Sequence, residues 1–332
     1  MDVLLFGGSE FVGRAYLEKL IAEGYTVDVI TRGIKPITVK GYRNHFKCDR
    51  KDEKDLAEHI ENRTYDYIFD ISAYTVEDIK PILSILNRSR LKRYFLVSTG
   101  GVYTPSDSIV SEEGNIGYNK NWGIYGVNKR NVELKLIKEH ALANFPILIF
   151  RPTYIYGEGN NLYRESYFFQ RLIDQLPIPY PDTNMGKAQY IHIDDLVNIS
   201  IKAIKVEKTN GEAFNITNPE IFTWKQLIQT FKEVTNREGE VISISQSDME
   251  RLEVTSKEFF PFRDVTYLLD IQKLQEFGLP TPTISLRAGL ERSFKWFTGQ
   301  NIPRQYHLFN SLDKVISSNI YIITNETRIV HY

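Results

Sequence analysis

Short apolar runs alternate with helical patterns over the first 150 residues of the chain. Continuous stretches of Val, Ile, Leu, Phe and Tyr are typical of strands that are buried on both faces of a sheet. Strands are expected at 2–6, 25–31, 44–48, 65–72, 93–99 and 145–150, and helices at 11–24, 52–60, 76–86 and 125–142. Strands that alternate with helices in this way predict an α/β fold, with a doubly wound parallel sheet covered by helices on both faces.

The alternation loosens after residue 150, where Pro, Asn and aromatic residues become more frequent. We therefore expect a core over residues 1–150 and a smaller lobe over 151–298, interleaved with the last elements of the core. A C-terminal extension of unknown role would follow over 299–332. Within this extension, two short strands are expected around Asn325 and Glu326.

Composition excludes several classes of function. The net charge of −1 provides no overall basic field for nucleic acid or an anionic membrane. Cys48 is the one cysteine, so no disulfide can form within the chain, which suits a reducing cytoplasm. Asp2 directly follows the first residue, and no apolar stretch is long enough to span a bilayer, so neither a signal peptide nor an anchor is expected. The 6 histidines show no metal-ligand spacing, so no metal site is expected.

The segment between the first strand and the first helix reads Gly7, Gly8, Ser9, Glu10, Phe11, Val12 and Gly13. Gly7 permits a tight turn after the strand, and Gly13 lets the helix pack closely on the sheet. The free N–H groups and the dipole at the helix start favour an anion. A strand before the turn and a helix after it are typical of a site for the pyrophosphate of a dinucleotide. The alternative is a tight turn without a ligand.

Glu10 stands at the middle position of this turn, where the pattern usually has glycine. A carboxylate there repels phosphate unless it turns to solvent or pairs with a cation. Arg14 lies four residues further along the predicted helix, at the spacing for such a pair. We therefore expect the turn to bind a cofactor, but more weakly than usual.

The end of the second strand indicates which dinucleotide is bound. NAD sites commonly have an acidic residue there, whereas this chain has Thr31 and Arg32. A hydroxyl and a guanidinium suit a 2′-phosphate, so NADP is preferred over NAD, unless Arg32 is only a solvated charge. Asp49, after the third strand, is a candidate for hydrogen bonding to the adenine. The remaining cofactor-binding candidates are Arg50, Ser72, Ala73 and Pro152.

Tyr125 and Lys129 lie four residues apart at the start of a predicted helix, so both side chains project from one face. A lysine ammonium beside a tyrosine lowers the pKa of the phenol, which can then act as a base. Ser98 and Thr99 end the strand upstream, at the sheet edge where ligands bind in such folds. A hydroxyl there can hydrogen-bond the oxygen that Tyr125 deprotonates.

The order of these motifs, closed by Arg151-Pro152 after the next strand, carries a family likeness. Over roughly residues 1–298 the chain resembles the extended short-chain dehydrogenase/reductases, which include NAD(P)-dependent sugar-nucleotide epimerases and dehydratases. The resemblance implies a Rossmann-type core that binds the dinucleotide and a C-terminal lobe that binds the substrate. It also implies a catalytic triad of Thr99, Tyr125 and Lys129, a transient 4-keto intermediate and a homodimer formed through the sheet-flanking helices. Gly100 and Gly101 stand where a dehydratase usually has an acidic pair, which favours epimerisation or simple oxidoreduction.

A narrower likeness points to the branch that contains chloroplast stem-loop binding proteins. It rests on the non-glycine residue in the turn, on RPTYIYG at 151–157 and on FPFRD at 260–264. This likeness leaves open an RNA-binding protein on an epimerase-like fold. A catalytically idle NADP-binding sensor is a further alternative, although the chain retains Tyr125 and Lys129.

The substrate side departs from the epimerase pattern at three positions. Tyr154 stands where the pattern has an asparagine, and Ala188 and Pro261 stand where it has arginines. Either Lys187, Arg263 and Arg164 take the place of the missing contacts to phosphate, or the substrate is not a standard sugar nucleotide. The substrate-binding candidates are therefore Ser98, Thr99, Tyr103, Tyr154, Asn161, Lys187 and Arg263. The tyrosines at 154, 156 and 163 suit either a sugar or nucleobase pocket or ordinary core. Asp194 and Asp195 are expected to cap the helix that follows them, and His192 to be a hydrogen-bonded structural residue.

Overall fold

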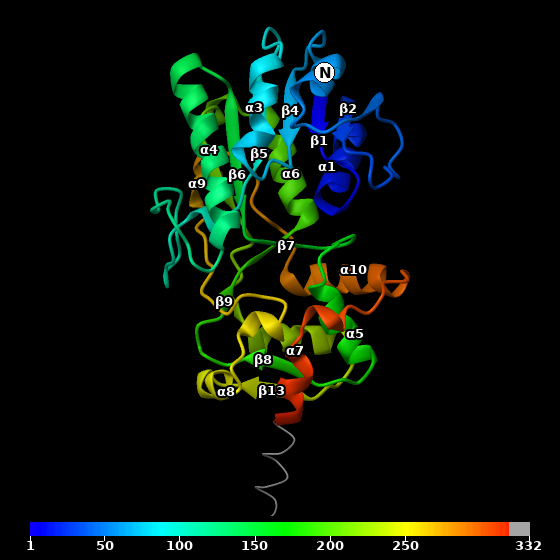
Figure 1. Cartoon of the computed structure of the whole chain (residues 1–332), viewed down its shortest axis with the longest axis vertical. Coiled ribbons are helices and arrows are strands. Elements are labelled where there is room, and N and C mark those ends of the chain that lie inside the picture. The colour runs from blue at the N-terminus through cyan, green and yellow to red at the C-terminus, as the bar shows by residue number, and fades with distance from the viewer. Residues whose placement is uncertain (319–332) are drawn as a thin grey trace, which may run out of the picture. The chain divides into compact units, whose positions relative to one another are not determined.

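A computed structural model describes residues 1–318 (Figure 1), so the strands expected around Asn325 and Glu326 lie outside the described residues. The chain forms two compact units, each built from separate segments. Unit 1 comprises Met1–Asn161, Tyr190–Pro219 and Leu269–Ile284. Unit 2 comprises Leu162–Gln189, Glu220–Leu268 and the described residues from Ser285 onward.

Unit 1 is built around a seven-stranded sheet in the order β11-β6-β5-β4-β1-β2-β3, in which every neighbouring pair is parallel. The strands are β1 (Asp2–Phe6), β2 (Thr26–Thr31), β3 (Asn44–Lys47), β4 (Tyr67–Asp70), β5 (Arg93–Val97), β6 (Ile147–Pro152) and β11 (Ala213–Ile216). The strand order reverses between β1 and β4, as in a doubly wound dinucleotide-binding sheet. The predicted fold class is confirmed.

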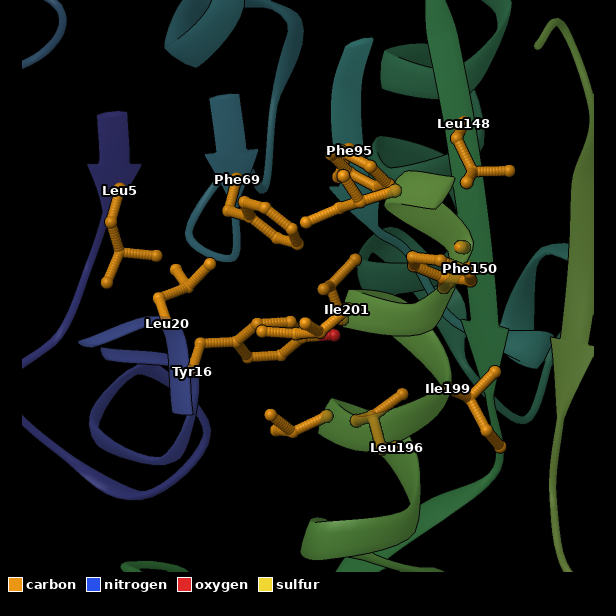
Figure 2. Packing of buried hydrophobic residues seen from close by; sticks show 14 of the residues in the cluster. Leu5, Tyr16, Leu20, Phe69, Phe95, Leu148, Phe150, Leu196, Ile199 and Ile201 are labelled. Atoms are coloured by element: carbon orange, nitrogen blue, oxygen red, sulfur yellow. The ribbon is translucent and has the colours of Figure 1, made fainter. Parts of the chain in front are cut away.

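Helices cover both faces of this sheet, because each strand is apolar on both sides. Helices α1 (Phe11–Ala22) and α6 (Ile193–Lys202) pack on one face, where Leu5, Tyr16 and Leu196 belong to a single buried cluster (Figure 2). Helices α2 (Glu53–Ile60), α3 (Val76–Ile85) and α4 (Gly123–Ala143) pack on the other face, against residues that include Leu4 and Phe6. The alternation of Leu4 and Leu5 between the two clusters follows from the two-residue period of a strand.

The smaller elements of unit 1 connect or extend this core. They are β7 (Tyr154–Tyr156), β10 (Tyr190–His192), α9 (Gln272–Glu276) and the short 3₁₀ turns η1 (Gly100–Val102), η2 (Ala203–Lys205) and η3 (Glu207–Thr209). Strands β7 and β10 pair in parallel. In unit 1, α9 contributes the fully buried Leu274 to the cluster under α1 and α6.

The start of α6 corrects one expectation. His192, not Asp194 or Asp195, is the N-cap, since its Nδ1 accepts a hydrogen bond from the backbone N–H of Asp194 at 3.2 Å. Asp195 instead accepts from the backbone N–H groups of Thr283 at 3.0 Å and Ile284 at 2.8 Å. Its carboxylate therefore fastens a distant segment of unit 1 to the first turn of α6, while His192 has the structural role that was expected of it.

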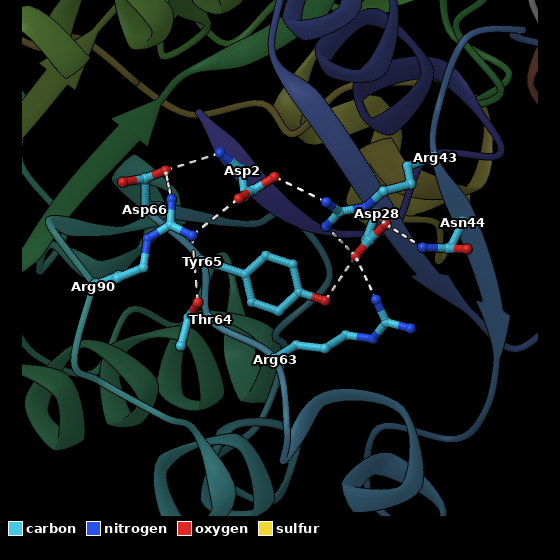
Figure 3. Close-up of polar contacts among 9 residues, drawn as sticks. All are labelled: Asp2, Asp28, Arg43, Asn44, Arg63, Thr64, Tyr65, Asp66 and Arg90. Carbon is cyan, nitrogen blue, oxygen red and sulfur yellow. Dashed lines mark hydrogen bonds and ion pairs between the residues drawn. The ribbon is translucent and has the colours of Figure 1, made fainter.

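A polar network lies near the amino ends of β1 and β2 (Figure 3). Its centre is Asp28, which has no exposed surface and accepts bonds from Arg43 Nε at 2.8 Å, Arg43 Nη2 at 2.7 Å and the Tyr65 hydroxyl at 2.9 Å. Burial raises the pKa of Asp28, but these bonds and one from Asn44 outweigh it, so the pKa is lowered overall. The network stabilises the amino ends of the strands while their carboxyl ends form the site described below.

Unit 2 is smaller and is held together by aromatic side chains. Its elements are α5 (Glu165–Ile173), β8 (Ile178–Pro181), β9 (Lys187–Ala188), β12 (Phe222–Thr223), α7 (Trp224–Thr235), β13 (Val241–Ile244), α8 (Gln246–Arg251), η4 (Ser256–Glu258), α10 (Leu286–Thr298) and η5 (Tyr306–Leu308). The rings of Phe168 and Phe231 stack with centroids 4.5 Å apart, and those of Tyr167 and Phe309 lie 4.9 Å apart. Phe309 shows that the described part of the C-terminal extension packs within this unit.

Candidate active site

A cleft of about 630 Å³ opens in unit 1 at the carboxyl ends of the strands. A ligand cleft in a doubly wound sheet is expected at this edge, next to the point where the strand order reverses. Most of the predicted cofactor residues line it: Gly7, Gly8, Ser9, Glu10, Phe11, Val12, Gly13, Thr31, Arg32, Asp49, Arg50, Ser72, Tyr125 and Lys129. Ser98 and Asn161, predicted from the substrate side, line the same cleft.

The glycine turn has the geometry of an anion cradle. Gly7 and Gly8 adopt φ values of +104° and +134°, which side chains rarely allow. A Cβ on Gly13 would lie 2.5 Å from the backbone nitrogen of Gly8, so only glycine lets α1 approach the turn this closely. Phe11 has a strained φ of +27°, and strain of this kind is concentrated at ligand sites. The N-cap residue Glu10 makes no side-chain capping bond, which leaves the helix N-terminus open to an anion. The cradle therefore fits a pyrophosphate.

The prediction that Glu10 pairs with Arg14 was wrong. Its carboxylate lies 3.1 Å from Nζ of Lys35, a residue of the loop that follows β2. Arg14 pairs instead with Glu18, at 3.6 Å, one helical turn in the other direction. Lys35 also lines the cleft, so the glycine turn and the loop after β2 are joined by an ion pair within the site.

The end of β2 combines one engaged side chain with one exposed side chain. The Thr31 hydroxyl accepts from the N–H of Gly33 at 3.1 Å and bonds to Nε2 of His45 at 2.7 Å. Arg32 is exposed on the cleft lining, and no ion pair to it occurs within residues 1–318. Its guanidinium is therefore available to a ligand. The carboxylate of Asp49 accepts from the N–H of Lys51 at 3.0 Å and also lines the cleft.

Arg50 is buried, and its guanidinium is already satisfied by protein atoms. It donates to both carboxylate oxygens of Asp70, at 2.7 Å and 2.5 Å, and to the carbonyl of Asp78 at 2.7 Å. A fourth bond, at 3.1 Å, reaches the hydroxyl of Ser72. Arg50 thus lines the cleft as a positioning residue for the ends of β3 and β4, rather than as a cation free for phosphate.

Lys129 is buried beneath the cleft and anchored by two backbone carbonyls. Its Nζ donates to Ala73 at 2.8 Å and to Val97 at 2.7 Å. Ala73, predicted to contact the cofactor, does not line the cleft; its carbonyl accepts a hydrogen bond from Lys129 instead. Burial lowers the pKa of Lys129 to about 8, an effect that the charges of Asp70 and Glu133 only partly offset. An ammonium with so low a pKa is typical of an active site.

Tyr125 lies one turn before Lys129 on α4 and lines the cleft. The centroid of its ring lies 6.2 Å from that of the Tyr74 ring. Nζ of Lys129 lies over the Tyr74 ring, 4.9 Å from its centroid. Tyr74 and Lys35 line the cleft and were missed by reasoning from the sequence. For Tyr74 the available signal was its position just after the predicted strand 65–72.

The two hydroxyl candidates at the end of β5 occupy different environments. The Thr99 hydroxyl accepts from the N–H of Gly101 at 3.1 Å, caps η1 and is buried away from the cleft lining. Ser98 lines the cleft, and its buried Oγ has no hydrogen-bond partner within residues 1–318. A buried hydroxyl without a partner is costly in a folded protein, so of the two hydroxyls that of Ser98 is the one available to a ligand in the cleft.

Tyr103 is buried and does not line the cleft, and its hydroxyl is bonded to other protein atoms, so its contact with substrate stays a prediction. Its hydroxyl donates to Asn215 at 2.8 Å and accepts from Arg151 Nη1 at 2.8 Å. Arg151 also binds Glu133 of α4, with Nη2 2.8 Å from the carboxylate. This network joins the helix that carries Tyr125 to the loop that follows β5.

Tyr154 and Tyr156 belong to an aromatic cluster rather than to the cleft lining. The ring of Tyr154 lies 5.9 Å from Trp122 and 5.5 Å from Tyr190, and that of Tyr156 lies 5.2 Å from His192. Both tyrosines are buried, which favours the interpretation as ordinary core. Tyr163 is buried among aromatic rings of unit 2. Pro152 ends β6 and is buried outside the cleft lining.

The remaining substrate candidates, Lys187 and Arg263, lie in unit 2. Lys187 is exposed on β9, whereas Ala188 next to it is fully buried and pairs with Phe222 of β12. A long cationic side chain would not fit at the buried position 188, so Lys187 is the residue of β9 that carries a positive charge. Within residues 1–318, no group of His, Cys, Asp and Glu side chains is arranged to hold a metal ion, and no helix is long and apolar enough to cross a membrane.

Comparison with known proteins assigns the chain to a family. Residues 3–217 match the NAD dependent epimerase/dehydratase family. The chloroplast stem-loop binding protein of 41 kDa b from Arabidopsis thaliana is 27% identical over 96% of this chain and 85% of its own length. A putative UDP-glucose 4-epimerase from Methanocaldococcus jannaschii is 23% identical over 90% of this chain and 99% of its own.

Solved structures share the fold. The UDP-glucose 4-epimerase of Thermotoga maritima, solved with UDP-glucose, superposes with a TM-score of 0.75 at 20% identity over 90% of this chain and 99% of that one. The Thermus thermophilus UDP-glucose 4-epimerase, solved with NAD, gives a TM-score of 0.72 at 17% identity over the same shares, 90% and 99%. These findings confirm the resemblance drawn from the motifs: the chain belongs to the NAD dependent epimerase/dehydratase family, enzymes of the extended short-chain dehydrogenase/reductase type.

Proposed function

We propose that the protein is an NAD(P)-dependent sugar-nucleotide epimerase, or a related oxidoreductase, that acts through a transient keto intermediate. The observation that carries this proposal is the composition of one cleft. It brings the glycine turn Gly7–Gly13 together with Ser98, Tyr125 and Lys129. A site for a dinucleotide and a set of acid–base groups thus share one space, as hydride chemistry requires.

The cofactor that we propose is NADP, with NAD as the less favoured alternative. Bound in the cleft, the dinucleotide supplies the acceptor for a hydride. The turn Gly7–Gly13 would hold its pyrophosphate, and the exposed guanidinium of Arg32 would bind a 2′-phosphate. Asp49 would bond the adenine. The absence of an acidic residue at the end of β2 supports the preference for NADP.

The chain's own residues would move the proton and hold the reacting oxygen. Tyr125 would take the proton of the substrate hydroxyl at its phenolic oxygen. Lys129 would lower the pKa of that phenol through its charge. Ser98 would donate a hydrogen bond to the same substrate oxygen, with Thr99 beside it. The buried position of Lys129 excludes water from its charge, which strengthens its effect on Tyr125.

A nucleotide sugar is the substrate class that we propose. Proteins of similar fold include epimerases solved with UDP-glucose and with UDP-N-acetylmuramic acid. We propose Lys187 and Arg263 as ligands of the substrate phosphates, in place of the arginines that the family pattern has near them. Asn161 and Tyr154 remain proposed substrate contacts, although the buried place of Tyr154 weakens its case. Gly100 and Gly101 favour epimerisation over dehydration.

We also propose a homodimer formed through the helices that flank the sheet. In support, α4 exposes Leu134, Ile137 and Leu142 along its length. Exposed apolar residues on one helix of a soluble fold are typical of an interface.

The test is conversion of a panel of nucleotide sugars in the presence of NADP or NAD, followed by chromatography of the products. Wild-type protein is expected to interconvert one epimer pair, and Tyr125→Phe to lose this activity. Wild-type protein that binds a dinucleotide but converts no member of the panel would favour the idle sensor.

An RNA-binding role is the second candidate, because the Arabidopsis relative is named for stem-loop binding. It predicts salt-sensitive binding of an RNA hairpin. The net charge of −1 and the acid–base groups of the cleft favour the enzyme. Tight binding of an RNA hairpin by protein that binds no dinucleotide would favour the RNA-binding role over the enzyme.

A further inference from the structure

Glu10 presents a physical problem that the proposed function leaves open. It is the N-cap residue of α1, and the helix N-terminus is where the cofactor phosphates would approach. Its carboxylate lines the same cleft, so an unpaired Glu10 would repel the diphosphate. The cradle is otherwise well formed, since Gly7, Gly8 and Gly13 have the required geometry. A cation that offset the charge of Glu10 would raise the affinity of the cradle for a phosphate.

Lys35 provides that charge. Its Nζ lies 3.1 Å from the Glu10 carboxylate, and both side chains are partly open to solvent, with 60% of the Lys35 side chain and 40% of that of Glu10 exposed. The ammonium therefore has free hydrogens directed away from the carboxylate. Glu10 comes from the turn after β1 and Lys35 from the loop after β2, so the pair brings a cation from the ribose end of the cleft to the helix N-terminus.

The other cations near the glycine turn are either paired with different carboxylates or lie at the end of β2. Arg50 is bonded to Asp70, and Nζ of Lys51 lies 3.5 Å from the carboxylate of Asp78. Arg14 pairs with Glu18 and does not line the cleft. Arg32 lines it next to Thr31, at the end of β2, where a ribose 2′-phosphate is bound in this type of fold. Among the cleft-lining cations of residues 1–318, Lys35 alone is paired with the N-cap residue of α1.

We infer that Lys35 is a ligand of the cofactor diphosphate and that Glu10 is the residue that positions it. This inference rests on the proposed function, because it takes the cleft to be a dinucleotide site. The ammonium of Lys35 contacts both the Glu10 carboxylate and a phosphate oxygen. Glu10, which stands where the pattern has glycine, therefore holds Lys35 in place in addition to repelling the phosphate. Arg32 then binds the 2′-phosphate, which only NADP has, and Lys35 binds the diphosphate, which NAD and NADP share.

Two measurable consequences follow. Because the diphosphate is common to both cofactors, Lys35→Met should weaken NAD and NADP by the same factor, roughly fivefold for a partly exposed charge pair. Arg32→Ala should weaken NADP alone. Because Glu10 positions Lys35, the loss caused by Lys35→Met should shrink to less than about twofold when Glu10 is already Gln.

The experiment is calorimetric titration of the full-length chain with NAD and with NADP at low salt. It compares wild type with Lys35→Met, Glu10→Gln and the double variant. Lys40→Met is the matched control, because Lys40 is an exposed lysine of the same loop that does not line the cleft. Circular dichroism confirms that each variant is folded. Glu10→Gln alone is not decisive, because it removes both the contact that positions Lys35 and the repulsion of the phosphate. The decisive quantity is how far Glu10→Gln changes the effect of Lys35→Met on cofactor affinity.

Equal loss for both cofactors, abolished in the Glu10→Gln background and absent in Lys40→Met, is the expected result. A loss confined to NADP would overturn the inference, because Lys35 would then bind the 2′-phosphate. An unchanged affinity, or the same loss with and without Glu10, would also overturn it. These outcomes all require that wild-type protein binds a dinucleotide. Wild-type protein that binds neither cofactor refutes the proposed function itself and is thereby distinguished from them.

Discussion

The buried ammonium of Lys129 makes the stability of the protein depend on pH in a defined direction. Its pKa falls from an ordinary 10.5 to about 8 on folding, because burial removes the charge from water. This gap corresponds to about 3 kcal/mol of unfavourable free energy at neutral pH. The folded pKa lies below the unfolded one, so between these two values the unfolded chain binds more protons. The free energy of unfolding contributed by this group therefore rises with pH from about 8 to about 10.5.

Urea unfolding of wild type and Lys129→Met at a series of pH values between about 7 and 10 measures this effect. The difference between the two proteins isolates Lys129, because the other titrating groups are common to both. We expect wild type to gain about 2–3 kcal/mol relative to the variant across this range. Lys129→Met also leaves the carbonyls of Ala73 and Val97 without their donor, but that cost is the same at every pH. A difference that stays flat with pH would refute the reasoning.

Four further predictions concern the site and its support. Tyr125→Phe should abolish turnover and leave cofactor affinity nearly unchanged, because the phenol acts on the transition state; steady-state kinetics with calorimetry checks this. NADP should bind more tightly than NAD, and Arg32→Ala should narrow the gap in a competition titration; equal affinities in wild type would contradict it. Gly13→Val should abolish dinucleotide binding measured by fluorescence, because its Cβ would lie 2.5 Å from a backbone nitrogen. Asp28→Asn should lower the free energy of unfolding by about 2 kcal/mol, because it removes the charge that Arg43 binds, and an unchanged urea midpoint would count against this.

Local patterns were sufficient for the fold and for most of the residues that line the cleft. Strands such as Arg93–Val97 are apolar over most of their length, which predicts burial on both faces, and a glycine turn between a strand and a helix is typical of a phosphate cradle. Tyr125 and Lys129 share one helix, so their spacing alone placed them together. In each case the interaction lies within one element or between neighbours in the chain.

Contacts between distant segments could not be predicted in this way. Helical spacing offers Arg14 two acidic partners, Glu10 and Glu18, and only the position of Lys35 decides between them. Arg50 was assigned to the cofactor because nothing near it in sequence shows that Asp70 binds it. Tyr103 was likewise assigned to the substrate, since the partners of its hydroxyl lie far along the chain. A polar residue near a strand end can bind a ligand or another part of the protein, and the sequence does not distinguish the two.

The proposed reaction moves a hydride out of a nucleotide sugar and returns it through a keto intermediate. Its sharpest test is conversion, in ordinary water, of a nucleotide sugar that carries deuterium on the carbon bearing the reacting hydroxyl. Proton magnetic resonance of the product then shows where the label is. We expect that the epimerised product keeps its deuterium, that the label slows turnover, and that Tyr125→Phe forms no product. A product that has exchanged its deuterium for solvent hydrogen would contradict hydride transfer, because the carbon would then have lost a proton rather than a hydride.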